Sequence, residues 1–456
     1  MVKERRRSLF FFIGLLLFFL GMYAVCGIGI YNDSEQYITM HIHREPLYPL
    51  FLAFFRAIAG EDAGLTLAVI TQNLLTACSI FFLTEYLCRK FSLGVMEELL
   101  LVVLEIMPHL VTKFVSAYGI FIESSIMSEA LCIPLFQFFV LFTLRMIFDN
   151  KTRDIVLSFL TAWLLSMTRG QFMTTILVWM VIYGFLLILH KQYKKLLIPA
   201  LAVVCAFGLR SLAVHTYNYF VTGYFMGNTY GQVNTLTNVI YACDEEDGGV
   251  FEEDSLERLF FDRFYAQADE MGANYKYGGD TFRERAEYLE EYHDRLKFEV
   301  LEAGLSAYFW TVEGTEDYYT QSRLSDEMAG QMLKKLLPVC VGQWLYDYVL
   351  LCTYGFIRSI AVVHPLVNRI ALLIYGAAIG LFAWQLLHNR KSDAIWVMGV
   401  VLLFIAANVC ATSITIMCLS RYMIYGFSFF YIALYLLGKE VIRESKFYKD
   451  RKGERG

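Results

Sequence analysis

Long runs of apolar residues recur along this chain, and short polar or charged segments separate them. Most of these runs reach about 20 residues, the length of helix that crosses a hydrocarbon core of about 30 Å. The pattern predicts about ten membrane-spanning helices, at residues 8–30, 64–87, 94–116, 124–147, 154–168, 171–189, 195–219, 366–388, 394–417 and 422–439. The first run is too long for the apolar core of a cleavable signal peptide, so we expect it to span the membrane.

Composition supports the same class of protein. The 456 residues are 57% hydrophobic and only 18% charged, whereas soluble domains carry about a quarter charged residues. The ten cysteines lie mostly inside the apolar runs and form no Cys-x-x-Cys pair, which argues against structural zinc or a disulfide framework. We therefore expect an all-α polytopic membrane protein.

The distribution of Lys and Arg predicts an orientation. Basic segments occur before the first span and at every second crossing, as "CRK" (88–90), "DNKTRD" (149–154), "HKQYKK" (190–195) and "HNRKSD" (388–393). Because cytoplasmic loops are enriched in Lys and Arg, both termini are expected in the cytoplasm. The first outer loop (31–63) and the long segment 220–364 then face the outside.

The chain divides by composition into four parts. Residues 1–219 form an N-terminal transmembrane module, 220–364 an extracytoplasmic cap, 365–440 the C-terminal transmembrane helices and 441–456 a basic cytoplasmic tail. The cap contains acidic stretches with apolar residues at helical spacing, which predicts two or three amphipathic helices. Residues 341–363 are apolar but contain Gln343, Asp347 and Arg358. We interpret them as an interfacial helix on the outer leaflet, and residues 47–59 as a second interfacial or re-entrant helix.

Charged and titratable residues gather at the expected outer ends of the spans. Such residues are costly at membrane level and are functional candidates. They are Asp33, Glu35, His41, His43, Arg44, Glu123, Glu129, Arg169 and Arg421. A carboxylate among arginines suits a phosphorylated lipid, because guanidinium forks bind phosphate and a carboxylate can act as general base towards a hydroxyl.

Short motifs add a resemblance to this pattern. "DSEQY" (33–37) followed by "REPLYPLFLAF" (44–54) resembles the first outer loop of the GT-C class of glycosyltransferases, which includes protein O-mannosyltransferases and aminoarabinose transferases. "IMSEALCIPLF" (126–136), "LLSMTRGQFM" (164–173) and "CLSRYMIYGFSFFYIALYLL" (418–437) are similar to later elements of that class and follow in the same order. The resemblance covers most of the chain, through short motifs.

The resemblance implies a function and a set of roles. The chain would be an inverting glycosyltransferase that moves a sugar from a polyprenyl phosphate to an extracytoplasmic glycan, lipid or protein. Asp33 would be the catalytic base, and Glu35 would support it, although Ser34 separates the two acids where many members have adjacent ones. The donor phosphate would bind Arg44, Arg169, Arg421 and Tyr422, with Glu129 in a supporting position.

The same residues allow other roles, and the same pattern allows other functions. Asp33 could instead cap the helix that begins at Ser34, and the arginines could be charges that reach the lipid headgroups. His41 and His43 are candidate ligands for a divalent cation, which some members of the class use, or could simply form hydrogen bonds. A lipid-linked-sugar flippase or transporter, and an O-antigen-type polymerase or ligase, are the rival functions.

Overall fold

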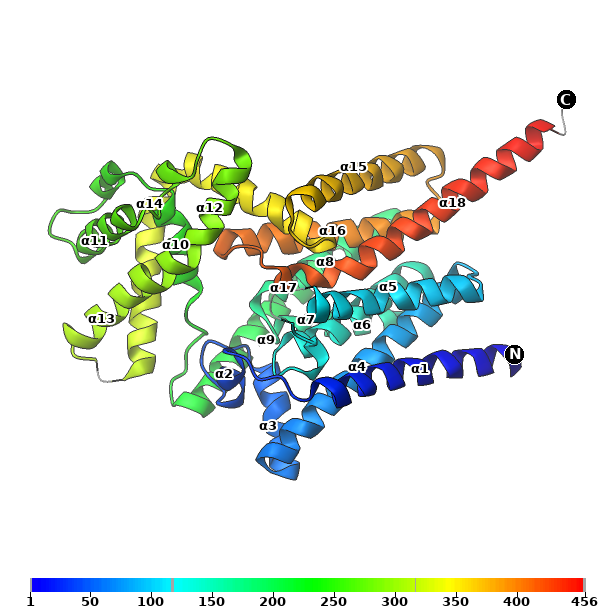
Figure 1. Cartoon of the computed structure of the whole chain (residues 1–456), viewed down its shortest axis with the longest axis horizontal. Coiled ribbons are helices and arrows are strands. Elements are labelled where there is room, and N and C mark those ends of the chain that lie inside the picture. Colours follow the sequence, from blue (N-terminus) through cyan, green and yellow to red (C-terminus); the bar gives the residue numbers. More distant parts are fainter. Residues whose placement is uncertain (1, 116–118, 316, 454–456) are drawn as a thin grey trace. The chain divides into compact units, whose positions relative to one another are not determined.

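The structure is a computed structural model that describes residues 2–115, 119–315 and 317–453. Figure 1 shows a chain built of helices joined by short loops, and the described residues contain no β-strand. The helices are α1 (Val2–Cys26), α2 (Ser34–Ile38), α3 (Leu47–Ala59), α4 (Glu61–Lys90), α5 (Val95–Phe114), α6 (Glu129–Asp149), α7 (Thr152–Ser166), α8 (Met173–Leu189), α9 (Leu197–Thr222), α10 (Gly231–Tyr241), α11 (Leu256–Met271), α12 (Phe282–Arg295), α13 (Ala303–Thr311), α14 (Tyr318–Ile360), α15 (Pro365–His388), α16 (Asp393–Thr415), α17 (Ser420–Met423) and α18 (Phe427–Gly453).

Among the described residues, nine helices are long and apolar enough to cross a membrane. The all-α, multi-pass membrane class predicted from the sequence is thereby confirmed. Eight of the nine coincide with predicted spans, and the ninth is α14. The predicted spans 94–116 and 154–168 form α5 and α7, which are not among the nine. Helix α7 is too short to cross a membrane by itself, because its 15 residues extend only about 22 Å.

The chain separates into two compact units. Unit 1 takes in the residues up to Ala213, together with Ser359–Asn408 and the residues from Met423 onward, and unit 2 takes in Val214–Arg358 and Val409–Tyr422. In unit 1, α4 packs against α1, α3 and α6, and α7 lies between α6 and α8. Unit 1 therefore contains most of the predicted spans.

Helices α3 and α4 form a tight hairpin in unit 1. Gly60 makes the turn with a φ of +82°, in the left-handed region that favours glycine. A Cβ on Gly64 would lie 2.4 Å from the Cα of Arg56, so the close approach of the two helices requires glycine there. Helix α3 has 13 residues, about 20 Å, and is too short to span the membrane, as the sequence predicted.

Three loops meet at one end of unit 1. The N–H of Gly29 donates to the carbonyl of Ser124 (2.8 Å), and the N–H of Ile126 donates back to Gly29 (2.9 Å). The N–H of Leu47 donates to the carbonyl of Met167 (2.9 Å). The first loop after α1, the segment before α6 and the α7–α8 connection are thus held together, which brings most of the predicted site residues into one region.

Unit 2 has its own hydrophobic core. Helices α10, α11 and α13 contribute to this core. The N-terminal half of α14 also contributes, through Met328, Met332 and Leu336. The amphipathic helices predicted for this segment are present as α11 and α12.

Helix α14 differs from its prediction. It runs without interruption for 43 residues, about 65 Å, so segment 341–363 is the C-terminal part of a longer helix that ends at Ile360. The charged side chains of this segment have partners within unit 2. Arg358 donates through Nη2 to Glu290 (2.7 Å) and through Nη1 to the carbonyl of Cys418 (3.0 Å). Asp347 accepts from Gln343 (2.9 Å). The position of this segment on the outer leaflet stays a prediction.

Candidate functional site

The site begins with an ion pair in the first loop after α1. Asp33 occupies the N-cap position of α2, yet its side chain makes no capping hydrogen bond. Nη2 of Arg44 lies 2.7 Å from Oδ1 of Asp33, and the two side chains are 21% and 24% exposed. The carboxylate therefore faces Arg44, so its role is to bind this guanidinium rather than to cap the helix.

Short-range contacts fix the guanidinium of Arg44. Its Nε donates to Oε1 of Gln36 (2.9 Å), and its Nη1 donates to the hydroxyl of Tyr37 (3.3 Å). The Cζ atom lies 4.7 Å from the centre of the Tyr37 ring, within the range of a cation–π contact. One turn of helix thus supplies three partners for a single arginine.

Tyr37 extends this network into the helix bundle. Its hydroxyl is 2.9 Å from Oγ of Ser128, at the start of α6. Ser128 also donates to Glu129 (3.3 Å) and accepts from Nη1 of Arg169 (3.3 Å). Arg169 and Glu129 form an ion pair in which the side chains are 14% and 2% exposed. A continuous polar path therefore links the partly exposed Asp33–Arg44 pair to a buried Arg169–Glu129 pair.

Burial shifts the pKa of Tyr37 on this path and of His41 in the neighbouring loop. It raises the pKa of Tyr37, although the nearby positive charge of Arg44 opposes the shift. Burial and the charge of Arg44 both lower the pKa of His41. At neutral pH the phenol is therefore protonated and the imidazole is uncharged.

A buried scaffold holds the segment that delivers Ser128 and Glu129. Nε2 of Gln72 donates to the carbonyls of Glu123 and Ser125, both at 2.8 Å. Nδ2 of Asn73 also donates to the carbonyl of Glu123 (2.7 Å). Nδ1 of His109 lies 2.8 Å from Oε1 of Glu123, and both side chains are buried. Glu123, a candidate from the sequence, thus pairs with His109 in the interior.

A third ion pair lies beside the α7–α8 connection. Arg210 of α9 pairs with Glu45, and the two side chains are 15% and 11% exposed. Nε of Arg210 also donates to the carbonyl of Ser166 (3.2 Å). Sequence reasoning missed this pair because Glu45 and Arg210 are 165 residues apart. Tyr37 and Ser128 were missed as site residues, although both lie inside the motifs that carry the resemblance.

Glu35, Arg421 and Tyr422 are the remaining predicted site residues. Glu35 is exposed. Arg421 and Tyr422 belong to unit 2, where Nη2 of Arg421 donates to the hydroxyl of Tyr422 (3.1 Å). A shared phosphate site for Arg44, Arg169 and Arg421 stays a prediction.

The histidines of the first loop lie next to each other. The rings of His41 and His43 are 4.6 Å apart, and the N–H of His43 points to Nδ1 of His41 (3.4 Å). In the described part of the chain, no three His, Cys, Asp or Glu side chains come together in a group that could hold a metal ion. A role for His41 and His43 in binding a cation stays a prediction.

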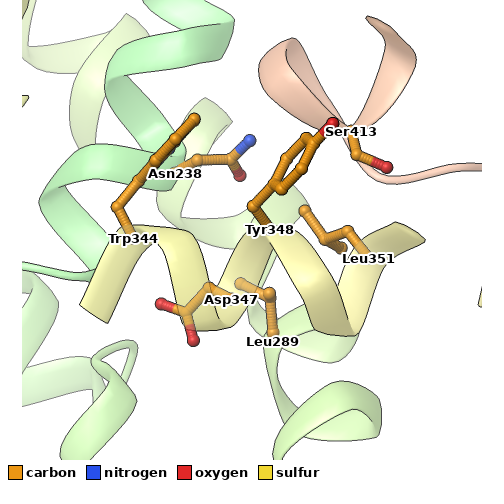
Figure 2. Close-up of a pocket in the computed structure, with 7 residues that line it drawn as sticks. All are labelled: Asn238, Leu289, Trp344, Asp347, Tyr348, Leu351 and Ser413. Atoms are coloured by element: carbon orange, nitrogen blue, oxygen red, sulfur yellow. The ribbon is translucent and has the colours of Figure 1, made fainter. Parts of the chain in front are cut away.

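Unit 2 contains a separate polar pocket (Figure 2). The rings of Trp344 and Tyr348 stack along one face of α14, with centroids 5.5 Å apart. Asn238 and Asp347 are each 4% exposed. Within the described residues, both amide atoms of Asn238 and Oδ2 of Asp347 have no hydrogen-bond partner. The space between these side chains is too narrow to hold a water molecule.

No protein-family model matches the chain, and no similar protein is found among curated proteins or solved structures. The resemblance to GT-C glycosyltransferases consequently rests on its short motifs, and the geometry of the network is the independent support for a function.

Proposed function

We propose that this protein is an integral membrane glycosyltransferase that moves a sugar from a polyprenyl-phosphate donor to an acceptor outside the cytoplasm, with inversion at the anomeric carbon. The acceptor would be a cell-wall polymer, a glycolipid or a protein. One observation carries the proposal. A partly exposed Asp33–Arg44 pair continues, through Tyr37 and Ser128, into the buried Arg169–Glu129 pair.

The proposed reaction assigns Asp33 as general base. Its carboxylate accepts the proton of the acceptor hydroxyl while the hydroxyl oxygen attacks the anomeric carbon. The bond between that carbon and the phosphate oxygen breaks, and polyprenyl phosphate leaves with the bonding electrons. Arg44 and Arg169 stabilise the charge that develops on the leaving phosphate.

The ion pairs suggest how the base becomes available. Without substrate, Arg44 holds Asp33 at 2.7 Å. An incoming phosphate competes for the same guanidinium, because Arg binds phosphate and carboxylate with the same fork of donors. When Arg44 turns to the phosphate, the carboxylate of Asp33 is released to accept a proton. Donor binding would thereby activate the base.

The sidedness of the site is part of the proposal. Three basic segments lie at the helix ends opposite to the network. Segment 88–90 ends α4, segment 149–154 joins α6 to α7, and segment 190–195 joins α8 to α9. Lys and Arg are enriched on the cytoplasmic side, which would put both termini there and the network outside. An epitope tag joined to the C-terminus should bind antibody only after the membrane is permeabilised, and binding in intact cells would refute this orientation.

The test of the activity uses membranes that contain the full chain and a panel of polyprenyl-phosphate sugars. Asp33→Asn should lower the transfer rate by about 10²- to 10⁴-fold, the usual contribution of a general base. Asp62→Asn is the matched control, because Asp62 is an exposed acid in the first turn of α4. Transfer by Asp33→Asn at the wild-type rate would remove Asp33 as the base.

A second arm separates chemistry from transport. The wild-type membranes are assayed for donor hydrolysis as well as for sugar transfer, and for movement of a labelled lipid-linked sugar between leaflets. Transfer or hydrolysis supports the enzyme. Movement between leaflets without any chemistry, for every sugar tested, would refute the enzyme and favour a flippase.

A further inference from the structure

A sizeable cavity lies in unit 1, away from the candidate site. It occupies about 470 Å³ between α7, α8 and the start of α9, within the range of 300–1,000 Å³ that is typical of ligand pockets. Its wall is aromatic. Phe159 and Trp179 have ring centroids 4.7 Å apart, and Trp179 and Tyr183 have centroids 5.2 Å apart. The indole N–H of Trp179 donates to Ser158 (3.0 Å), which fixes the ring in the wall.

The mouth of this cavity is polar and lies at the helix ends. Its residues are Asn150, Thr152, His190, Gln192 and Lys195, all of them exposed. Helix α7 begins at Thr152 and α8 ends at Leu189, so the mouth lies where apolar helix gives way to polar loop. In a bilayer this is the level of the lipid headgroups.

The two loops at the mouth carry an excess of positive charge. Segments 149–154 and 190–195 contain five basic residues, namely Lys151, Arg153, Lys191, Lys194 and Lys195. Their two acids, Asp149 and Asp154, lie 3.9 and 3.1 Å from Nε of Arg145, and Asp154 also lies 4.0 Å from Nε of Arg153. With Arg145 counted, six basic residues face two acids, so the mouth keeps a net positive charge. The positive charge that remains at the mouth favours the binding of an anion.

We propose that the α7–α8 cavity is a binding site for an anionic phospholipid. The phosphate lies at the mouth against Lys195 and His190, and one acyl chain lies along Phe159, Trp179 and Tyr183. An apolar cavity that opens at headgroup level beside clustered lysines matches both parts of such a lipid.

The chain offers matched variants for each part of the site. Lys194 and Lys195 are exposed neighbours in one short 3₁₀ helix (Tyr193–Lys195), but only Lys195 lines the cavity. Val156 and Leu160 lie one turn apart on α7 and are 56% and 43% exposed, but only Val156 lines the cavity. Lys195→Gln and Val156→Phe therefore change the site, while Lys194→Gln and Leu160→Phe are their controls.

The experiment measures lipid retained by the purified full-length protein in neutral detergent, by native mass spectrometry. Phosphatidylglycerol and phosphatidylcholine with identical chains are compared, and inorganic phosphate is tested by thermal stabilisation. Phosphatidylglycerol should bind in preference to phosphatidylcholine. Lys195→Gln should weaken that binding about fivefold and Lys194→Gln by much less. Val156→Phe should abolish it, and Leu160→Phe should leave it intact.

Three results would overturn the proposal. The first is equal binding of the two lipids, which would mean ordinary contact with the bilayer. The second is the same effect of Lys194→Gln and Lys195→Gln, which would mean diffuse surface charge. The third is stabilisation by inorganic phosphate equal to that by phosphatidylglycerol, which would mean an anion site without a lipid chain. Circular dichroism of each variant confirms that the helices are retained.

Discussion

Replacement of Glu129 by Gln probes the ion pair at the buried end of the network. The Glu129 side chain is 2% exposed and that of Arg169 is 14% exposed, so water screens their interaction little. Removal of one partner from a buried pair costs about 3–5 kcal/mol, because the other charge is left without compensation. Gln can still accept one hydrogen bond from Arg169, and Arg169 keeps some exposure. We therefore expect Glu129→Gln to lower the free energy of unfolding by about 3 kcal/mol.

A double-mutant cycle isolates the pairwise part of this energy. Glu129→Gln, Arg169→Gln and the double variant are compared by equilibrium unfolding in mixed micelles. The exposed pair of Arg89 and Glu85 on α4, with Arg89 75% exposed, provides the control cycle. Its coupling energy should not exceed about 0.5 kcal/mol, whereas that of the buried pair should reach about 2–3 kcal/mol.

The size of the coupling energy decides between two interpretations. Hydrogen bonds between helices within a membrane protein average about 0.6 kcal/mol. A coupling energy of that size for Glu129 and Arg169 would refute the view that the network ends in a preorganised charge pair. It would reduce the pair to an ordinary interhelical contact, and Arg169 would lose its rationale as a fixed phosphate ligand.

Three further predictions concern the same unit. Gly64→Ala should destabilise the protein by about 1–3 kcal/mol, because the added Cβ meets the backbone of Arg56; Gly14→Ala, with no atom within 4 Å of its Cβ, should have little effect on the melting temperature. Folding lowers the pKa of His41, so the unfolded chain binds more protons and stability is lost as pH falls below about 6.5. His41→Gln should flatten the melting temperature between pH 5 and 7, and an unchanged slope would contradict this. Tyr37→Phe removes a hydroxyl that contacts Arg44 and Ser128 and should cost about 1–2 kcal/mol in an unfolding titration; no measurable loss would show that the path is not continuous.

The membrane class and most of the helices follow from the sequence, because the thickness of a bilayer fixes the length of an apolar segment. Helix α14 is longer than that reasoning predicted, because segment 341–363 is the C-terminal part of a 43-residue helix. Asp347 and Arg358 in segment 341–363 argued for an interfacial helix, since charges at depth are costly. The structure pairs Arg358 with Glu290, 68 residues away, and the helix continues through both charges. The partner that removes the cost cannot be read from the local pattern.

The same limit applies to the site. Asp33, Arg44, Glu129 and Arg169 were identified because charges at the ends of apolar runs are rare enough to be informative. Their pairing was not predicted, because Arg169 follows Glu129 by a complete helical hairpin, α6 and α7. The resemblance assigned both arginines to a phosphate, whereas the structure shows each with a carboxylate partner. The sequence supplies the residue types, and the meeting of the first loop, the start of α6 and the α7–α8 connection supplies the partners.

The three ion pairs of this region differ in a way that bears on the mechanism. The carboxylates are 24% exposed for Asp33, 11% for Glu45 and 2% for Glu129. Each of the three arginines already contacts a carboxylate, so an incoming anion competes with that carboxylate for the guanidinium. A carboxylate that loses its arginine must be hydrated again. The free-energy cost of this step is lowest for Asp33, the carboxylate that is most exposed to water. In the proposed reaction, Asp33 would therefore be the first carboxylate that a phosphate displaces, and it is also the acid that the reaction needs as a base.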